Sequence, residues 1–231
     1  MSGLDPTRLL LDAGAFLSPP SRLTGQCLRE CPVQKRALYP PHPLQSVSMR
    51  HFQNGRSVLD DRCHALSSRC VFSYAGNRLY LVDTRNDEIA ILGTSPLGFV
   101  DAFGGSGSEP GRLRYPLGIA CSADALYVVE RDNHRVQAFR HDGTHSRLIG
   151  GEGTRPGRFQ HPRGVAVGAA GLFVSEAARL TVLSLLGEPQ QVVCFEPRAQ
   201  LHGLHLHAER LYAADEGDRK LHVLLLRSAG A

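Results

Sequence analysis

Lysine is scarce in this chain of 231 residues: Lys35 and Lys220 are the only lysines among 26 basic residues. Arginine therefore carries the formal net charge of +4, which suits nucleic acid or an acidic partner, although codon composition also explains an arginine bias. No apolar run approaches the roughly 20 residues of a membrane helix. The first twenty residues lack the basic segment and the cleavage site of a secretory signal. We therefore expect a cytoplasmic protein without a membrane partner.

Motifs of several enzyme classes are also missing. The glycine-rich stretches 104–111 and 150–157 complete no G-x-G-x-x-G and are not followed by Lys-Ser or Lys-Thr, which argues against a phosphate-binding loop. No G-x-S-x-G motif occurs, which argues against a serine hydrolase. Carboxylates recur once in each repeat described below, a pattern that favours turn capping over a single catalytic centre.

Metal-ligand spacing is not found either. The six cysteines are expected to be reduced thiols, because no secretory signal places the chain in an oxidising compartment. One group of soft ligands fits neither a RING nor a zinc ribbon: Cys27, Cys31, Cys63, His64 and Cys70. A second group, His202, His205 and His207, is interpreted as strand and loop histidines. We predict no metal site and no cofactor.

An internal repeat is the strongest positive signal in the sequence. Much of the stretch 103–143 returns 46 residues later, without gaps, and the aligned pairs are Gly105/Gly151, Gly107/Gly153, Pro110/Pro156, Gly111/Gly157, Arg112/Arg158, Pro116/Pro162, Gly118/Gly164, Ile119/Val165, Leu126/Leu172, Glu130/Glu176 and Val136/Val182. A period of about 40 to 50 residues with short apolar runs and Gly/Pro turns is typical of a propeller blade.

The sequence predicts two regions that differ in proline content and in hydrophobic periodicity. Residues 1–45 are rich in proline and predict a flexible arm, with one short helix around 7–16. Residues 46–231 predict a β-propeller that begins with a hairpin at 46–60, because Asn54-Gly55 separates two strand-like runs.

Four blades can be followed by sliding the apolar pattern, with repeats at about 70–93, 103–143, 149–188 and 195–227. Each first strand is apolar at alternate positions, as a strand requires. Each second strand ends in a carboxylate: Asp83, Glu130, Glu176 and Asp215.

The best repeat resembles the NHL-repeat family of β-propellers. The residues that carry this resemblance are Phe103-Gly104-Gly105, Pro110-Gly111-Arg112, 115–119 (YPLGI), 126–130 (LYVVE) and 133–139 (NHRVQAF). The match extends over 149–176, and the segment Ala178-Arg179-Leu180-Thr181 has lost the Asn-His-Arg element. The resemblance implies an all-β propeller that binds protein or RNA on a loop face. Ubiquitin ligase activity is not implied, because no RING segment is present.

Ring closure is left open by the sequence, since propellers of this family usually have about five or six blades. Three arrangements remain: a compact four-bladed ring, an open arc capped by the hairpin, or an arc completed by a partner. An open blade edge would favour self-association. We expect the incomplete or open ring.

One loop face gathers the candidate binding residues. In a four-stranded antiparallel blade, the loop that enters the first strand lies on the same face as the loop between the second and third strands. The best two repeats place there the residues Arg112, Arg114, Tyr115, Arg131, His134, Arg158, His161 and Arg163, together with Phe159. Arginine and aromatic side chains on one face suit phosphate contacts and base stacking as well as a protein partner. For each single arginine, the alternative is that it only holds its own loop.

The favoured function is therefore a non-catalytic interaction scaffold that binds a protein partner through the loop faces. The alternative is an RNA-binding propeller that uses the same arginine and tyrosine residues for single-stranded RNA. A metal-dependent lyase or lactonase-like hydrolase is less favoured, because no set of ligands repeats at positions that would converge on the axis.

Overall fold

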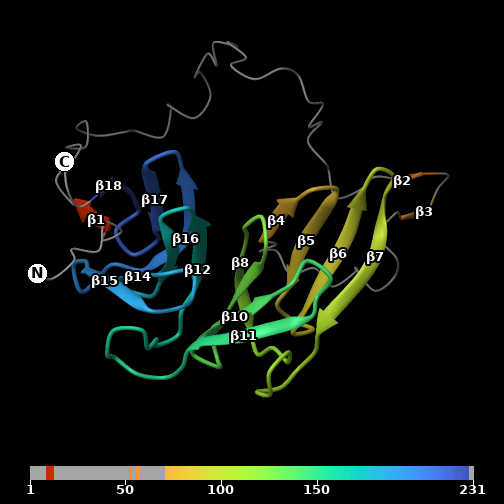
Figure 1. The fold of residues 1–231 in the computed structure, drawn as a ribbon, viewed down its shortest axis with the longest axis horizontal. Coiled ribbons are helices and arrows are strands. Elements are labelled where there is room, and N and C mark those ends of the chain that lie inside the picture. The colour runs from red at the N-terminus through yellow and green to blue at the C-terminus, as the bar shows by residue number, and fades with distance from the viewer. Residues whose placement is uncertain (1–8, 13–51, 54–55, 58–70, 229–231) are drawn as a thin grey trace, which may run out of the picture.

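The protein is an all-β propeller of four blades, as predicted (Figure 1). The computed structural model describes the backbone of residues 9–12, 52–53, 56–57 and 71–228, and the side chains of residues 71–226. Every sheet is antiparallel, and the blades follow one another in chain order around the ring. No helix able to cross a bilayer occurs among these residues.

The strands of the four blades have the following bounds. Blade 1 contains β4 (Phe72–Ala75), β5 (Arg78–Asp83), β6 (Glu88–Thr94) and β7 (Leu97–Gly104). Blade 2 contains β8 (Pro116–Cys121), β9 (Leu126–Glu130), β10 (Arg135–Phe139) and β11 (His145–Gly150). Blade 3 contains β12 (Gly164–Gly168), β13 (Gly171–Ser175), β14 (Arg179–Leu183) and β15 (Pro189–Cys194). Blade 4 contains β16 (Leu201–His207), β17 (Arg210–Asp215) and β18 (Lys220–Ser228).

The fourth strand of blade 4 comes from the N-terminal end of the chain. Strand β1 (Leu9–Asp12) pairs antiparallel with β18, with Leu9 opposite Ser228 and Asp12 opposite Leu225. The helix predicted around 7–16 was therefore wrong over these residues, and they do not belong to a free arm. A short apolar run cannot be identified as helix or strand by its period alone, and here the open edge of β18 decides.

A separate hairpin is formed by β2 (Phe52–Gln53) and β3 (Arg56–Ser57), where the Asn-Gly signal predicted one. Its strands pair only with each other among the described residues, and Figure 1 draws them beyond β7. The turn itself, the rest of the predicted arm and the cysteines from Cys27 to Cys70 lie outside the described residues.

Hydrophobic packing between neighbouring blades forms the core. The middle strands of the blades are the most buried, and all five residues of β9 and all five of β10 are buried, because blade 2 has a neighbouring blade on both sides. Three core clusters join blade 1 to blade 2, blade 2 to blade 3, and blade 3 to blade 4. Among the described residues, no such cluster joins blade 4 to blade 1.

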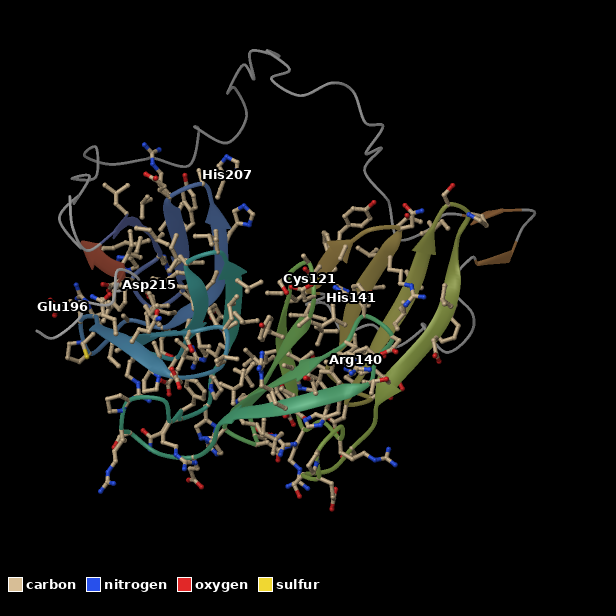
Figure 2. All side chains as sticks on the ribbon, viewed as in Figure 1. Cys121, Arg140, His141, Glu196, His207 and Asp215 are labelled. Carbon is tan, nitrogen blue, oxygen red and sulfur yellow. The ribbon has the colours of Figure 1, made fainter. Side chains whose placement is uncertain are left out.

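Polar contacts reinforce the junction of blades 1 and 2. The buried Tyr80 hydroxyl donates to the His141 carbonyl oxygen at 3.0 Å, and burial raises the pKa of Tyr80. The Thr84 hydroxyl donates to the Pro116 carbonyl oxygen at 2.8 Å. Figure 2 shows His141 at this junction, close to Cys121.

Candidate functional site

Buried carboxylates at the ends of the second strands hold the candidate loop face in shape. Glu130 is fully buried, and its Oε1 accepts the backbone N–H of Arg114 at 3.1 Å and the Nδ2 of Asn133 at 2.5 Å. Its Oε2 accepts the Nε of Arg135 at 2.6 Å and the Nε2 of Gln137 at 2.8 Å. Every oxygen of this carboxylate is thus engaged in joining the entering loop to the turn between β9 and β10.

Arg135 extends the same network into the entering loop of blade 2. Its guanidinium donates to the carbonyl oxygens of Ser108 at 2.7 Å, Arg112 at 3.1 Å and Glu109 at 3.2 Å. The Arg135 residue is only 9% exposed, so these contacts are made largely away from water. The buried Glu130–Arg135 pair therefore fixes the backbone that presents the exposed side chains.

Arg179 plays the same part in blade 3, although the sequence suggested that this element was lost. Its Nε donates to Glu176 Oε2 at 2.5 Å, and its other nitrogens reach the carbonyl oxygens of Thr154 at 2.6 Å and Arg158 at 2.8 Å. The turn after Glu176 is two residues shorter than the turn after Glu130, because Arg179 occupies the place of Arg135 in the strand ladder.

The gapless repeat register consequently fails beyond this turn. Val136 follows Arg135 as Leu180 follows Arg179, so the predicted pair Val136/Val182 was wrong. An alignment that relies on apolar positions does not detect this two-residue deletion. Apolar residues recur at every second position of a strand, so a shift by two residues places apolar residues opposite one another again.

The two aligned arginines of the entering loops bind their own backbone. Arg112 Nη1 donates to the Gly104 carbonyl oxygen at 3.0 Å, and Arg158 Nη1 donates to the Gly150 carbonyl oxygen at 3.2 Å. Both residues stay exposed. They therefore hold their loops as the alternative interpretation proposed, while adding positive charge to the surface. The placement of Phe159 on this face was wrong, because its ring is fully buried in the core.

Four of the predicted residues form two pairs, Tyr115 with Arg131 in the loops of blade 2 and His134 with His161 at the junction of blades 2 and 3. The Arg131 guanidinium carbon lies 4.9 Å from the centre of the Tyr115 ring, a cation–π distance. The His134 and His161 rings lie 4.4 Å apart, and His134 Nδ1 accepts the His161 backbone N–H at 3.1 Å. Tyr115 is 41% exposed, so one aromatic surface remains open beside the arginine.

Asp87 positions Tyr115 and was not identified from the sequence. Its Oδ1 accepts the Tyr115 backbone N–H at 2.7 Å. Asp87 and His134 both have a positive φ, 55° and 53°, and occupy the same turn position in successive blades. Asp87 of blade 1 thus orients the exposed Tyr115 of blade 2, as His134 of blade 2 accepts a hydrogen bond from His161 of blade 3. Only an alignment of the turns of successive repeats could have indicated this role of Asp87.

The two remaining candidates, Arg114 and Arg163, differ in their position. Arg114 is exposed beside Tyr115, and only its backbone is tied to Glu130. Arg163 is half-buried and lines a cavity of about 300 Å³ that all four inner strands, β4, β8, β12 and β16, surround. Arg163 therefore belongs to the central cavity rather than to the loop surface.

Histidine and cysteine side chains line or border the same cavity. His205 lines it, and its ring stacks on His207 with centroids 6.5 Å apart; Figure 2 shows His207 at the end of blade 4. Cys121 also lines it, and burial raises the pKa of its thiol. Within residues 71–226, no three His, Cys, Asp or Glu side chains are grouped as a metal site would need.

Asp215 repeats the role of Glu130 in blade 4. Its Oδ1 accepts the N–H groups of Gln200 at 2.8 Å and Asp218 at 3.2 Å, and its Oδ2 accepts His222 Nε2 at 3.0 Å. Burial by itself raises the pKa of Asp215, but these hydrogen bonds together lower it to about 2. Figure 2 shows the carboxylate inside the blade.

Comparisons with solved structures confirm the propeller. The chain is similar to a nidogen/laminin complex (TM-score 0.56, 15% identity, 68% of this chain and 60% of that one). It is also similar to virginiamycin B lyase from Staphylococcus aureus (0.50, 15%, 69% and 55%) and to the computationally designed protein Ika4 (0.50, 11%, 74% and 98%). The chain thus spans little more than half of the first two. No family model and no curated protein matches the sequence, so these likenesses identify the chain as a β-propeller and do not establish NHL repeats.

Proposed function

We propose that this propeller is a non-catalytic interaction scaffold that binds an acidic segment of a protein partner on the loop face of blades 2 and 3. The observation that carries the proposal is the surface cluster of Tyr115, Arg131, His134 and His161, set on loops that buried carboxylates hold in place. Tyr115 and His161 are exposed, and Arg131 and His134 are half-buried. Because the backbone is already ordered, a partner loses little entropy in organising this surface.

The side chains of the cluster suit protein recognition. Tyrosine and arginine are enriched among the residues that dominate binding energy at interfaces, since each offers a large contact area and directional hydrogen bonds. The loops that carry the cluster also expose four arginines and three carboxylates, namely Arg112, Arg114, Arg155 and Arg158 against Glu109, Asp132 and Glu152. An acidic partner would complement that excess.

The recurring carboxylates support a role without catalysis. In both Glu130 and Asp215, each carboxylate oxygen accepts at least one hydrogen bond from a loop or a neighbouring strand, which accounts for their recurrence by a structural role. Similar propellers include both a protein in a complex with laminin and a lyase, so the fold alone does not decide between binding and chemistry.

Single-stranded RNA is the second candidate ligand, favoured by the open ring of Tyr115 beside Arg131. A base could stack on that ring while Arg114 contacts a phosphate. RNA binding would depend steeply on salt, because each phosphate contact releases counterions.

The test compares the wild-type chain with the variant Arg114→Glu/Arg131→Glu. Proteins recovered by affinity purification, with and without nuclease, are quantified by mass spectrometry, and a single-stranded RNA oligonucleotide is titrated directly. Arg140→Glu is the matched control, because Arg140 is exposed on the opposite loop face, between β10 and β11.

The proposal predicts a protein that is retained after nuclease treatment, lost by at least about tenfold in the double variant, and unchanged in Arg140→Glu. If the oligonucleotide binds in a salt-dependent manner and the double variant loses this binding, the RNA-binding function replaces the protein-binding function. Recovery that is equal for all three chains would overturn the loop face as the binding site.

A further inference from the structure

Each filled interface between blades is built in the same way. A blade presents one face to the next blade, here called its forward face, and the other face to the preceding blade, its rear face. On the forward faces of blades 1, 2 and 3, an aromatic residue of the second strand and an aliphatic residue of the third strand are at most 2% exposed: Tyr80 and Ile89, Tyr127 and Val136, Phe173 and Leu180.

The forward face of blade 4 carries the same residue types but is uncovered. Leu221 occupies the position of Ile89, Val136 and Leu180, and it is 62% exposed. Tyr212, at the position of Tyr80, is half-buried, and Ala214 beside it is exposed. The forward face of blade 4 is therefore an interface surface that no blade of the described residues covers.

Equivalent glycines of the inner strands show where the next blade is absent. A Cβ on Gly118 would lie 2.9 Å from the Arg163 carbonyl oxygen of blade 3, and a Cβ on Gly164 would overlap the His202 carbonyl oxygen of blade 4. A Cβ on Gly203 would meet nothing within 4 Å. The space into which the following inner strand packs is thus open beyond blade 4.

The rear face of blade 1 is exposed at its inner strand. Phe72 and Tyr74 are 63% and 59% exposed, whereas Ile119 and Val165, which correspond to Phe72, are each 5% exposed. The middle of this face is already covered in a single copy, since Leu81, Ala90 and Leu92 are only 3 to 5% exposed. The open part of the rear face is therefore the edge formed by β4. A strand in the place of β4 would fit the open space beside Gly203.

We propose that a second copy of this chain fills both positions, with blade 1 of each copy packed on blade 4 of the other. One chain carries the exposed inner strand β4 of blade 1 and the open space beside Gly203 of blade 4, which are the two sides of the inner-strand contact that it forms three times internally. Two copies related by a twofold axis satisfy both surfaces of both chains and close a ring of eight blades, within the usual range for propellers.

The packing of the inner strands supports closure by two copies rather than one. Strand β8 packs against β4 and β12, and β12 packs against β16, whereas no comparable contact joins β16 to β4 among the described residues. A four-bladed ring closed within one chain would bring β4 against β16 and cover Phe72, which instead stays 63% exposed beside the central cavity.

The experiment measures the mass of the full chain in solution by light scattering and by sedimentation over a range of concentrations. The wild-type chain is expected to be a dimer. Leu221→Glu and Gly203→Ala should each raise the dissociation constant of the dimer by about 100-fold, about tenfold at each of two identical contacts. Gly98→Ala is the matched control, because a Cβ on Gly98 also meets nothing within 4 Å but lies on β7.

A mixing experiment identifies which faces meet. Leu221→Glu alters the forward face of blade 4, and Phe72→Glu alters the rear face of blade 1. Each variant alone should be monomeric, with a circular dichroism spectrum and melting temperature like those of the wild-type chain, since both side chains are exposed in one copy. An equal mixture should form dimers that keep one intact contact.

Four outcomes would overturn the proposal. A wild-type monomer at every concentration would show that no second copy binds. A dimer that Leu221→Glu and Gly203→Ala leave intact would place the contact elsewhere. A mixture of Leu221→Glu with Phe72→Glu that stays monomeric, or a wild-type chain that forms a ladder of larger species, would rule out this closed arrangement.

Discussion

Replacement of Arg135 by methionine tests whether a buried ion pair holds the loop face. The change keeps the aliphatic volume but removes the 2.6 Å contact with Glu130 and the donors for three loop carbonyl groups. Glu130, which is fully buried, then loses its charged partner. Breaking a buried pair in this way costs about 3 to 5 kcal/mol, a large part of the stability of a domain.

Urea unfolding followed by circular dichroism measures this loss, and the melting temperature should fall by roughly 10 °C for a chain of this length. Arg140→Met is the control and should change the free energy of unfolding by less than about 0.5 kcal/mol, because Arg140 is exposed. Arg179→Met should cost less than Arg135→Met, since the Arg179 side chain is 18% exposed against 10%. A loss below about 1 kcal/mol for Arg135→Met would refute the reasoning.

Two further predictions concern the fold. Gly164→Ala should destabilise the chain by about 3 kcal/mol and Gly118→Ala by about 1 to 2 kcal/mol. The reason is that the added Cβ would overlap the next blade at Gly164, whereas at Gly118 it would only make a close contact with that blade. Thermal unfolding in which Gly118→Ala is the more destabilising change would contradict this order. Because folding lowers its pKa, Asp215 should contribute on the order of 1 to 2 kcal/mol of stability that is complete above pH 3.8 and is lost as the pH falls toward 2. In Asp215→Asn, the free energy of unfolding should therefore depend less steeply on pH between 3.8 and 2. An unchanged pH dependence in that range would contradict the assignment.

The blades could be predicted from the sequence because each one is a local pattern. Alternate apolar residues, the turn glycines and prolines, and a carboxylate at the end of each second strand lie within about 40 residues of one another, and antiparallel strands pair with their neighbours in the chain. The loop face also followed from the order of the strands, which places Tyr115 and Arg131 on the same side.

Contacts between distant segments could not be predicted in this way. Only the open edge of β18 makes a strand of Leu9–Asp12, and only the packing of one blade on the next buries Phe159. The sequence by itself determined the repeat, most of the strands and most of the side chains that face the loop surface. The tertiary structure decided which of those side chains stay exposed and left the forward face of blade 4 uncovered, because burial depends on whether another sheet lies against a face and not on the residues of that face alone.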